Sequence, residues 1–247
     1  IGAWDTSNVT DIFYMFDGAQ QFNQDISSWD VSNATNMLYM FRNASAFNQP
    51  LGNWDVSNVT TMHGMFQGST YFNQPLDNWD VSSVTNMTLT FTSSGFNQNI
   101  NNWDVSSVNS MWGMFQTSSF NQPLDNWDVS NVTTMFQMFF GTPFNQDIGN
   151  WNTSSLTDIG AMFVMTPFNQ DISGWDVSNV TSMYWTFLQA GFFNQDLSSW
   201  DISNVTDFTS AFNWSGFSTE NYDSMLNSWS NLPLQPNLSF DAGGLTY

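Results

Sequence analysis

The sequence predicts an α/β repeat fold, a right-handed solenoid of about nine turns in which each turn supplies a short parallel strand and a short helical turn. Three observations predict it. Tryptophan recurs every 24 or 25 residues, an alternating Trp-x-Val segment surrounds most copies, and a serine then precedes apolar residues at helical spacing. A unit of this length cannot enclose a core alone, so neighbouring units must stack. The repeated tryptophans are Trp4, Trp29, Trp54, Trp79, Trp103, Trp127, Trp151, Trp175 and Trp200.

The strand of each turn is expected around this tryptophan. Ile or Leu precedes each Trp by three residues, as Leu51 precedes Trp54, and Val follows by two in most copies, as Val56 does. Side chains that alternate in this way point to opposite faces of a strand. Stacked copies would form a parallel sheet with one strand per turn. The period overlaps that of the leucine-rich repeats, so the solenoid is predicted to be leucine-rich-repeat-like.

A short helical turn is expected after the serine that follows this segment. In one copy, Ser57 precedes Val59, Met62, Met65 and Phe66, whose spacing places them on one face of a helix. Serine is a favourable N-cap because its oxygen can accept a hydrogen bond from an unpaired backbone N–H. The apolar face is short, which predicts one or two turns of α or 3₁₀ helix, with methionine as adaptable core filling.

A Phe-Asn-Gln motif occurs eight times and follows a bend of variable length. The variation indicates an exposed bend, where an insertion disturbs no stacked column. We expect the asparagines to form a ladder between turns, because they follow a core Phe and a buried bend needs their hydrogen bonds. The alternative is a row of amides that binds a ligand. The motifs begin at Phe22, Phe47, Phe72, Phe96, Phe120, Phe144, Phe168 and Phe193.

Two regions are expected, a solenoid over residues 1–216 and a C-terminal cap over residues 217–247. The cap should contain a final strand over Leu238–Asp241 and, before it, a helix over Ser218–Trp229 whose apolar face is Tyr222, Met225, Leu226 and Trp229. Residues 1–16 form a half-repeat whose edge would be bare unless a partner or further residues of the protein covered it, and a start inside a repeat fits a mature, cleaved or trimmed chain.

Composition excludes several classes of protein. Among 247 residues there is one Arg (Arg42), no Lys and one His (His63), and the formal net charge is −20. Nucleic acids and anionic membranes bind through Lys and Arg, so neither is expected as a partner. Cysteine is absent, which excludes disulfides and thiol chemistry, and no stretch of apolar residues is long enough to predict a membrane span.

The consensus resembles a known family. Its motif W-D-V-S-N-V-T-x-M-x-x-M-F, followed by F-N-Q-[DP]-[IL], resembles the bacterial surface protein 26-residue repeat of the BspA-like leucine-rich-repeat surface proteins, also classed as a domain of unknown function in mycoplasma and Listeria lipoproteins. The tail N-Y-D-S-M-L-N-S-W-S is similar to the closing segment of marine bacterial members. The resemblance covers essentially the whole chain. It implies an extracellular or cell-surface solenoid without catalytic activity, with adhesion or surface coating as its role.

Asn-x-Ser/Thr sequons are the most informative short motifs, because they predict N-linked glycans. Six of them share one phase of the repeat, just after the serine, so the sugars would form a row along one edge. The alternative is that Asn-Val-Thr only satisfies the start of a helical turn. The candidate sites are Asn8, Asn33, Asn43, Asn58, Asn86, Asn131, Asn152, Asn179, Asn204, Asn213 and Asn237.

Aspartate follows most of the repeated tryptophans and forms a second row. Stacked carboxylates repel one another, so either their pKa values rise or cations such as Ca²⁺ collect along the row. The favoured alternative is that each Asp accepts a backbone N–H near the serine. No D-x-D-x-D-G calcium loop is present. The weak metal candidates are Asp30, Asp55, Asp80, Asp104 and Asp128.

No catalytic constellation is found, so no enzyme is expected, and His63 should replace a polar surface residue. The predicted function is a non-catalytic, secreted or cell-surface structural protein that carries glycans and associates head-to-tail into filaments. The alternative is an adhesin or binding module that recognises a host protein or polysaccharide through one face of the solenoid. Candidate contacts of that kind are aromatic residues in the variable bends, such as Tyr184-Trp185 and the stretch from Phe136 to Phe140.

Overall fold

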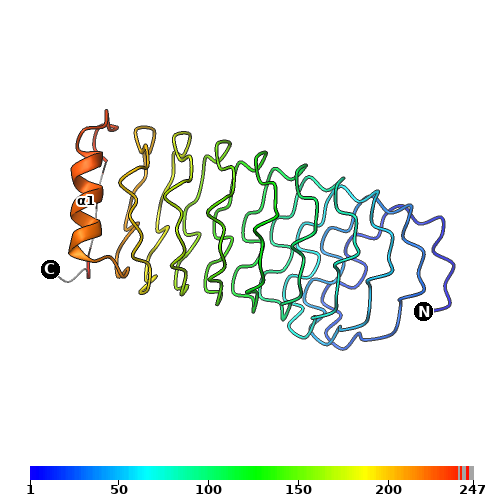
Figure 1. Ribbon diagram of the computed structural model, residues 1–247. Helices are drawn as coiled ribbons and strands as arrows, with labels where there is room; N and C mark the ends of the chain where they lie inside the picture. The colour runs from blue at the N-terminus through cyan, green and yellow to red at the C-terminus, as the bar shows by residue number, and fades with distance from the viewer. Residues whose placement is uncertain (239, 241–242, 245–247) are drawn as a thin grey trace.

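The computed structural model describes residues 1–238, 240 and 243–244. The chain winds in successive coils that stack along one direction, with the N-terminus at one end of the stack and a helix at the other (Figure 1). Parallel β-bridges of a single residue join each coil to the next, from Asp11 with Asn36 through to Ser182 with Asp207. The bridges confirm the repeat and its register, because equivalent residues lie above one another.

The predicted α/β class is wrong. Within the described residues the only helix is α1, Thr219–Trp229, and no repeat contains a strand longer than one bridged residue. Local turns prevent a strand at Trp-x-Val: Trp54 N–H donates to the Leu51 carbonyl at 3.0 Å, and Val59 N–H to the Val56 carbonyl at 2.9 Å. The fold is therefore a stack of irregular coils and not a leucine-rich-repeat-like α/β solenoid.

The segment predicted to be a helical turn alternates between two kinds of backbone hydrogen bond. Tyr39 N–H donates to the His63 carbonyl of the next coil at 2.9 Å, and Phe41 N–H donates to Met65 in the same way at 2.8 Å. Between them, Met40 N–H closes a local turn on the Met37 carbonyl at 3.2 Å. Half of the N–H groups are thus used between coils, where a helix would use them internally.

Two residues per repeat adopt left-handed backbone geometry, which also interrupts a helix. The first column of positive φ is Tyr14, Tyr39, Gly64, Leu89, Gly113, Gln137, Ala161, Trp185 and Ser210. The second column, four residues later, is Gly18, Asn43, Gly68, Ser93, Thr117, Gly141, Met165, Gln189 and Trp214. Most positions are not Gly, and each such residue costs about 1 kcal/mol. Contacts between coils therefore impose this conformation on the chain.

Tryptophans form one column of the core. Trp29 and Trp54 stack with ring centroids 6.5 Å apart and parallel planes, and stacked pairs of this kind recur as far as Trp200. Each indole from Trp29 to Trp200 also bonds to the preceding coil, as Trp54 Nε1 donates to the Ile26 carbonyl at 3.2 Å. The repeated tryptophan thus buries its ring in the core and still gives its indole N–H a hydrogen-bond acceptor.

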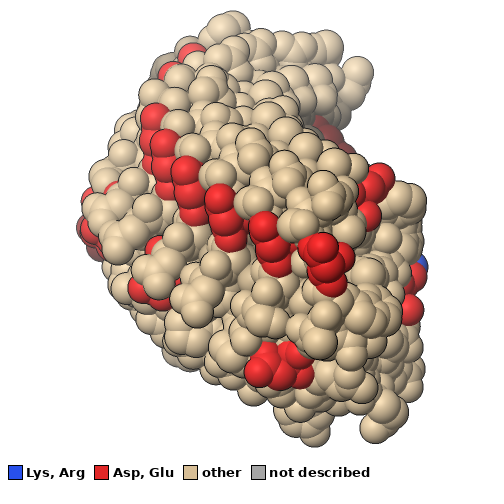
Figure 2. All heavy atoms as spheres, turned by 90° about the vertical axis from the view of Figure 1, so that its right-hand side faces the viewer, with Lys and Arg blue, Asp and Glu red and all other residues tan. Residues whose placement is uncertain are grey.

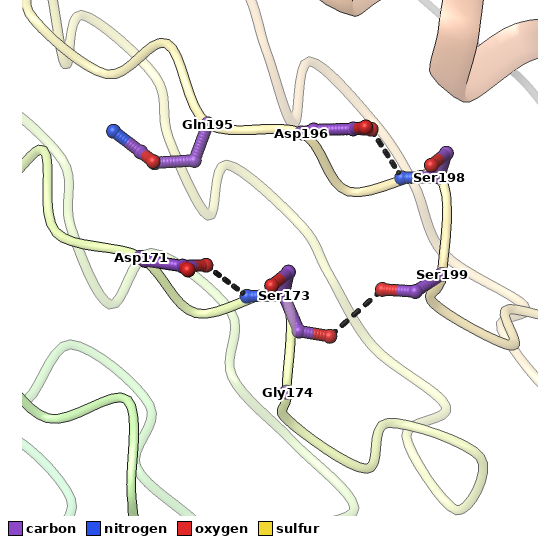
Figure 3. A pocket seen from close by; sticks show the side chains of 7 residues that line it. All are labelled: Asp171, Ser173, Gly174, Gln195, Asp196, Ser198 and Ser199. Atoms are coloured by element: carbon purple, nitrogen blue, oxygen red, sulfur yellow. Dashed lines mark hydrogen bonds between the residues drawn. The ribbon is translucent and has the colours of Figure 1, made fainter.

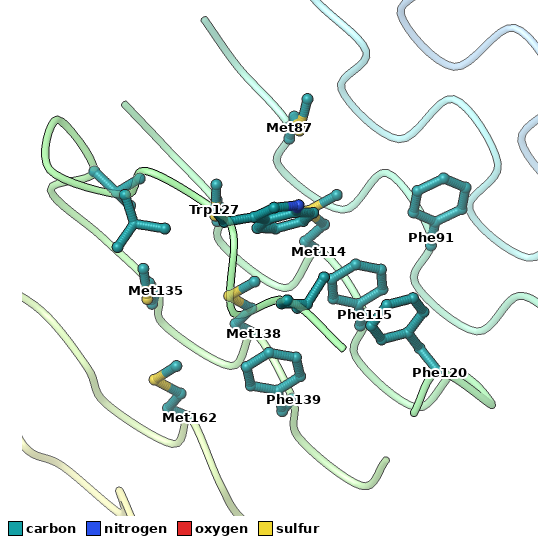
Figure 4. Close-up of a cluster of buried hydrophobic side chains, with 14 of the residues drawn as sticks. Met87, Phe91, Met114, Phe115, Phe120, Trp127, Met135, Met138, Phe139 and Met162 are labelled. Atoms are coloured by element: carbon teal, nitrogen blue, oxygen red, sulfur yellow. The ribbon is translucent and has the colours of Figure 1, made fainter. Parts of the chain in front are cut away.

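Phenylalanine and methionine columns pack beside the tryptophans in the interior, together with columns of Ile, Leu and Val (Figure 4). Phe115 stacks on Phe120 of its own coil at 3.9 Å and on Phe139 of the next coil at 5.9 Å. Met114 and Met138 lie beside these rings and are fully buried. The predicted assignment of the Met column to the core is confirmed.

The asparagine ladder is also confirmed. Asn48 N–H donates to Asn23 Oδ1 at 2.9 Å, and Gln49 Nε2 donates to the same oxygen at 2.9 Å. The pattern recurs in every coil until Asn194. Each Asn of the motif therefore accepts from the next coil, and the motif joins neighbours instead of presenting a ligand-binding row.

The helix α1 closes the C-terminal end, as predicted for this segment. Ser218 is its N-cap, and Ser218 N–H donates to Asn194 Oδ1 at 2.8 Å while Asn221 Nδ2 donates to it at 3.0 Å. These two donors replace the Asn and Gln of a further repeat. Trp229 is buried at the end of the helix, whereas Leu226, predicted on the same face, is 36% exposed.

The predicted final strand, Leu238–Asp241, includes Ser239 and Asp241, which lie outside the described residues. Before it, Gln235 Nε2 donates to the Ser203 carbonyl at 2.8 Å. In earlier coils the equivalent serine carbonyl accepts from an Asn side chain of the next coil, as the Ser32 carbonyl accepts from Asn58 Nδ2. The closing segment therefore supplies Gln235 as a substitute donor where the next coil would supply an Asn.

Candidate functional site

The six in-phase sequons lie along one edge, which we name the sequon edge: Asn8, Asn33, Asn58, Asn131, Asn179 and Asn204. All six side chains are exposed. Five donate through Nδ2 to a serine carbonyl of the preceding coil; Asn58, for example, lies 2.8 Å from the Ser32 oxygen. An amide with one sugar keeps one N–H, so a glycan and this hydrogen bond are chemically compatible.

The remaining sequons do not form a row. Asn43, Asn152 and Asn237 are exposed, whereas Asn86 and Asn213 are half-buried. Asn86 Oδ1 accepts from Thr88 N–H at 2.9 Å, and Asn43 has a positive φ of 57°. The structure thus separates six equivalent acceptor candidates from five that occupy individual environments.

The aspartates that follow tryptophan form turns with the serine two residues later. Asp80 Oδ1 accepts from the Ser82 hydroxyl at 2.6 Å and from Ser82 N–H at 3.0 Å. The same contacts are made at Asp30, Asp55 and Asp104, and Asp128 accepts the backbone N–H. The serine is held by a carboxylate and does not cap a helix.

These hydrogen bonds lower carboxyl pKa values. The serine hydroxyl contributes most and its backbone N–H contributes next, which holds the pKa below the ordinary value at Asp5, Asp30, Asp80, Asp176 and Asp201. Acidic side chains align in a row across one surface of the stack (Figure 2). Among the described residues, no group of three or more acidic or His side chains is arranged to hold a metal ion.

A polar hollow of about 400 Å³ lies between two neighbouring turns near the C-terminal end (Figure 3). Asp171 and Asp196 line it, but each carboxylate is bonded to its own turn, through Ser173 N–H and Ser198 N–H, both at 2.9 Å. Ser199 Oγ bridges the two turns by donating to the Ser173 carbonyl at 2.7 Å. The two carboxylates do not point toward a common ligand position. The hollow is therefore a gap between two turns whose carboxylates are already hydrogen-bonded within their own turn.

A second surface differs from repeat to repeat, and we name it the variable face. It is formed by the bridged residue of each coil and the second residue after it. Aromatic side chains occur here without periodicity, and two of them are well exposed: Phe13 by 49% and Trp112 by 44%. The nine pairs are Asp11/Phe13, Asn36/Leu38, Thr61/His63, Asn86/Thr88, Ser110/Trp112, Thr134/Phe136, Asp158/Gly160, Ser182/Tyr184 and Asp207/Thr209.

Beside this face, the single arginine is held within the chain. Arg42 forms a bidentate ion pair with Asp17, with Nε 2.7 Å from Oδ1, and this hydrogen bond raises the pKa of Arg42. Its guanidinium lies 4.4 Å from the ring centroid of Tyr39 and 5.2 Å from that of Tyr14. A carboxylate and two aromatic rings thus surround the cation.

His63 is half-buried and contacts this cluster through Tyr39, whose hydroxyl lies 2.6 Å from His63 Nε2. Burial lowers the pKa of His63. His63 lies at the surface at a position that is polar in other repeats, such as Thr88, and its imidazole also packs edge-on against the Tyr39 ring with centroids 4.8 Å apart.

An open pocket of about 280 Å³ lies in the middle of the variable face and is lined by Trp112, Thr134, Phe136 and Asp158. The Trp112 and Phe136 rings meet at 67° with centroids 6.2 Å apart. Asp158 Oδ1 accepts from Gly160 N–H at 2.8 Å. Burial raises the pKa of Asp158, and the negative charge of Asp207 adds to the rise.

Sequence reasoning named Phe136 as a candidate contact but missed Trp112 and Asp158. Departure from the repeat was an available signal for Trp112, whose column carries small or polar residues such as Thr88, Gly160 and Thr209, but not for Asp158, whose column is polar in every repeat. Tyr184 and Trp185, also named in advance, stack on one another with centroids 4.4 Å apart and are half-buried. The pocket itself depends on side chains from three consecutive coils and could not be located without the register.

Comparison with known proteins gives one family. Its description is "Mycoplasma protein of unknown function, DUF285", and its model matches three overlapping segments, residues 1–95, 78–167 and 140–234. No curated protein matches the chain. No helix in the described part of the chain has the length and apolar character required to cross a membrane.

Proposed function

Since the chain belongs to the DUF285 family, whose function is unknown, we propose that it is a non-catalytic structural protein of the cell surface, exposed to the extracellular medium. One observation carries the proposal: the aromatic columns and the asparagine ladder run from coil to coil along the stack. Each coil is fixed to the next by burial and by side-chain hydrogen bonds. Such a stack is suited to present a long, stiff and regularly spaced surface.

We propose that the sequon edge carries covalent glycans. The six Asn side chains are exposed and repeat once per coil where the sequon is complete, which suits a row of sugars. Intact mass of the protein from its native source tests this. A mass well above 28.0 kDa, which falls on enzymatic removal of N-glycans, supports the proposal. An unmodified mass contradicts it.

We further propose head-to-tail association. At the N-terminal end, Trp4 is 56% exposed, and Trp4 Nε1 has no hydrogen-bond partner among the described residues. At the opposite end, an apolar hollow is lined by Leu226, Trp229 and Leu238. Two different apolar ends favour a heterologous contact, and a heterologous contact that does not close by rotation produces filaments.

Concentration-dependent sedimentation and electron microscopy test the association. Trp4→Glu and Leu226→Glu each place a charge at one end, so either should shift the protein to monomers. Tyr71→Glu is the matched control, because Tyr71 is an aromatic residue 71% exposed elsewhere on the surface. A wild-type protein that stays monomeric at every concentration would refute the contact.

A second candidate function is a binding module, and the variable face favours it. Regular columns need no variation for stability, yet this face carries Phe13, His63, Trp112 and Phe136 at equivalent positions. Exposed aromatic residues are enriched where proteins bind partners. A glycan array and a pull-down with host proteins test this reading. Binding that is lost in Trp112→Ala and kept in Tyr71→Ala would support it, and no binding in either assay would contradict it.

A further inference from the structure

We propose that the pocket of Trp112, Phe136 and Asp158 binds the guanidinium group of an arginine side chain on a partner protein. This inference deepens the second candidate function, the binding module, by assigning one subsite and its ligand chemistry. It rests on the composition of the pocket, on an unused carboxylate oxygen, and on a comparison within the chain itself.

The pocket supplies the groups that hold an organic cation. Trp112 and Phe136 form two walls at 67°, which enclose a compact group on two sides. The negative faces of aromatic rings attract cations, and Trp does so most strongly. Asp158 lines the same pocket and provides the opposite charge. Thr134, the fourth lining residue, adds a hydroxyl.

Asp158 has capacity to accept from a ligand. Its Oδ1 is occupied by Gly160 N–H, whereas its Oδ2 accepts no hydrogen bond from another described residue. The side chain is only half-buried, so this oxygen can be reached from the pocket. A carboxylate placed this way gains more from a cation than one exposed to water, because burial has removed part of its hydration.

The chain already contains the same arrangement with its cation in place. Arg42 lies over Tyr39 and Tyr14 and is paired with Asp17, so a guanidinium, two rings and a carboxylate form one cluster. The central pocket has the two rings and the carboxylate. The sequence offers no second Arg or Lys to complete it, since Arg42 is its single residue of either type. A partner must therefore supply the cation.

The charge of the whole protein favours the same ligand. A formal net charge of −20 attracts cations toward the surface and accelerates their encounter with it. A neutral sugar would gain nothing from that field. The Trp112 and Phe136 rings also meet at a steep angle, whereas a sugar ring packs best on a single exposed aromatic face.

Binding of small probes to the whole protein, followed by NMR, tests the assignment. N-ethylguanidinium is the probe, and ethylurea is its neutral control of similar shape. We expect N-ethylguanidinium to bind with affinity about tenfold above that of ethylurea, as a cation–π contact with a paired carboxylate predicts. Tetramethylammonium provides the second arm, because tighter binding of that ion would overturn the assignment to arginine.

Variants locate the site. Asp158→Asn, Trp112→Ala and Phe136→Ala should each weaken N-ethylguanidinium binding about tenfold, which is the size of one strong charge or ring contact. Asp77→Asn changes the net charge equally at an exposed aspartate elsewhere, and Tyr71→Ala removes an exposed ring elsewhere; both should bind as the wild type does. Phe136→Ala keeps the test decisive if Trp112→Ala fails to fold.

Two results would overturn the proposal: no preference for the cation over ethylurea, or equal loss of binding in Asp77→Asn. Either result leaves the wider binding function standing if the protein still captures a partner in the pull-down. Conversely, if wild type and Trp112→Ala capture a partner equally well, the variable face is not the surface that binds this partner. The result with N-ethylguanidinium would still decide whether the pocket binds a guanidinium group.

Discussion

Trp103 Nε1 donates to the carbonyl oxygen of Leu76, one repeat earlier, at 2.9 Å. The indole is almost completely buried between its neighbours, so this hydrogen bond lies inside the aromatic column. Eight tryptophans make the equivalent contact, which ties the core packing of one coil to the backbone of the preceding one.

Trp103→Phe should therefore destabilise the protein by about 1–3 kcal/mol, from the lost hydrogen bond and the lost ring area. Urea unfolding measures the change. The control is Trp4→Phe, at a position that is largely exposed and has no preceding coil in the structure. An effect at Trp103 no larger than that at Trp4 would contradict the role of the buried hydrogen bond.

Gly64 should tolerate a side chain poorly. It has a φ of +57°, and a Cβ there would lie 2.2 Å from the ring of Tyr39, whereas a Cβ on Gly141 would meet nothing nearer than 3.4 Å. Gly141→Ala should cost about 1 kcal/mol for left-handed geometry alone, and Gly64→Ala should cost more because of the clash. Thermal unfolding compares them.

The clash can be isolated with a double variant. Tyr39→Ala removes the ring that a Cβ on Gly64 would meet, so Gly64→Ala should cost less in the Tyr39→Ala background than in the wild type. Equal costs in the two backgrounds would show that backbone strain alone makes Gly64 necessary.

Asn97 should contribute to stability through its acceptor oxygen. Its Oδ1 accepts from Asn121 N–H at 2.9 Å and from Gln122 Nε2 at 3.1 Å. Asn97→Ala leaves two donors without this partner and should cost about 1–3 kcal/mol. Asn97→Asp keeps an acceptor in the same place and should recover much of the loss at neutral pH. If Asp and Ala are equally destabilising in urea unfolding, the ladder is not the source of the effect.

Stability should fall in acid because of the Asp–Ser turns. The hydroxyl of Ser178 and its N–H lower the pKa of Asp176 in the folded protein, so the folded state binds a proton less readily than the unfolded chain. The stabilisation is complete above the unfolded pKa, about 3.9, and is lost as pH falls through the lowered folded pKa. Carboxyl NMR titration checks this, and Ser178→Ala should raise the pKa of Asp176. No change on that substitution would contradict the assigned cause.

Asp158 should have the opposite effect. Burial raises its pKa, so its ionised form disfavours folding and stability falls as pH rises through the raised value. Asp158→Asn should consequently stabilise the protein at neutral pH, and the gain should shrink as pH falls below the folded pKa. Urea unfolding across this pH range measures it. A destabilised Asn variant at neutral pH would show that the carboxylate has a compensating partner in solution.

The periodic side chains made the register predictable, but they did not determine the backbone. Spacing placed Phe115, Trp127 and Asn121 correctly in the core columns and the ladder, because burial and side-chain hydrogen bonds repeat with the sequence. The helical turn was wrong because residues such as Leu89 and Gln137 adopt positive φ, which their own preferences oppose. Contacts between coils supply that conformation, and one repeat considered alone does not contain them.

The candidate sites show the same limit. The sequon edge could be predicted because its residues repeat. The pocket joins Trp112, an aromatic residue in a column that varies between repeats, to Asp158, 46 residues later, which the stacking brings beside it. Irregular positions carry no periodic signal, so only the structure shows which of them are neighbours.

Ser218 and Asn221 offer Asn194 the same pair of donors that every internal coil receives from its successor. The terminal helix therefore uses contacts that any coil of the stack can provide. Whole repeats could be duplicated or lost before this helix without changing how it packs on the last coil. Genes derived from one ancestor could then differ in length by multiples of one repeat and still encode a chain with the same terminal packing.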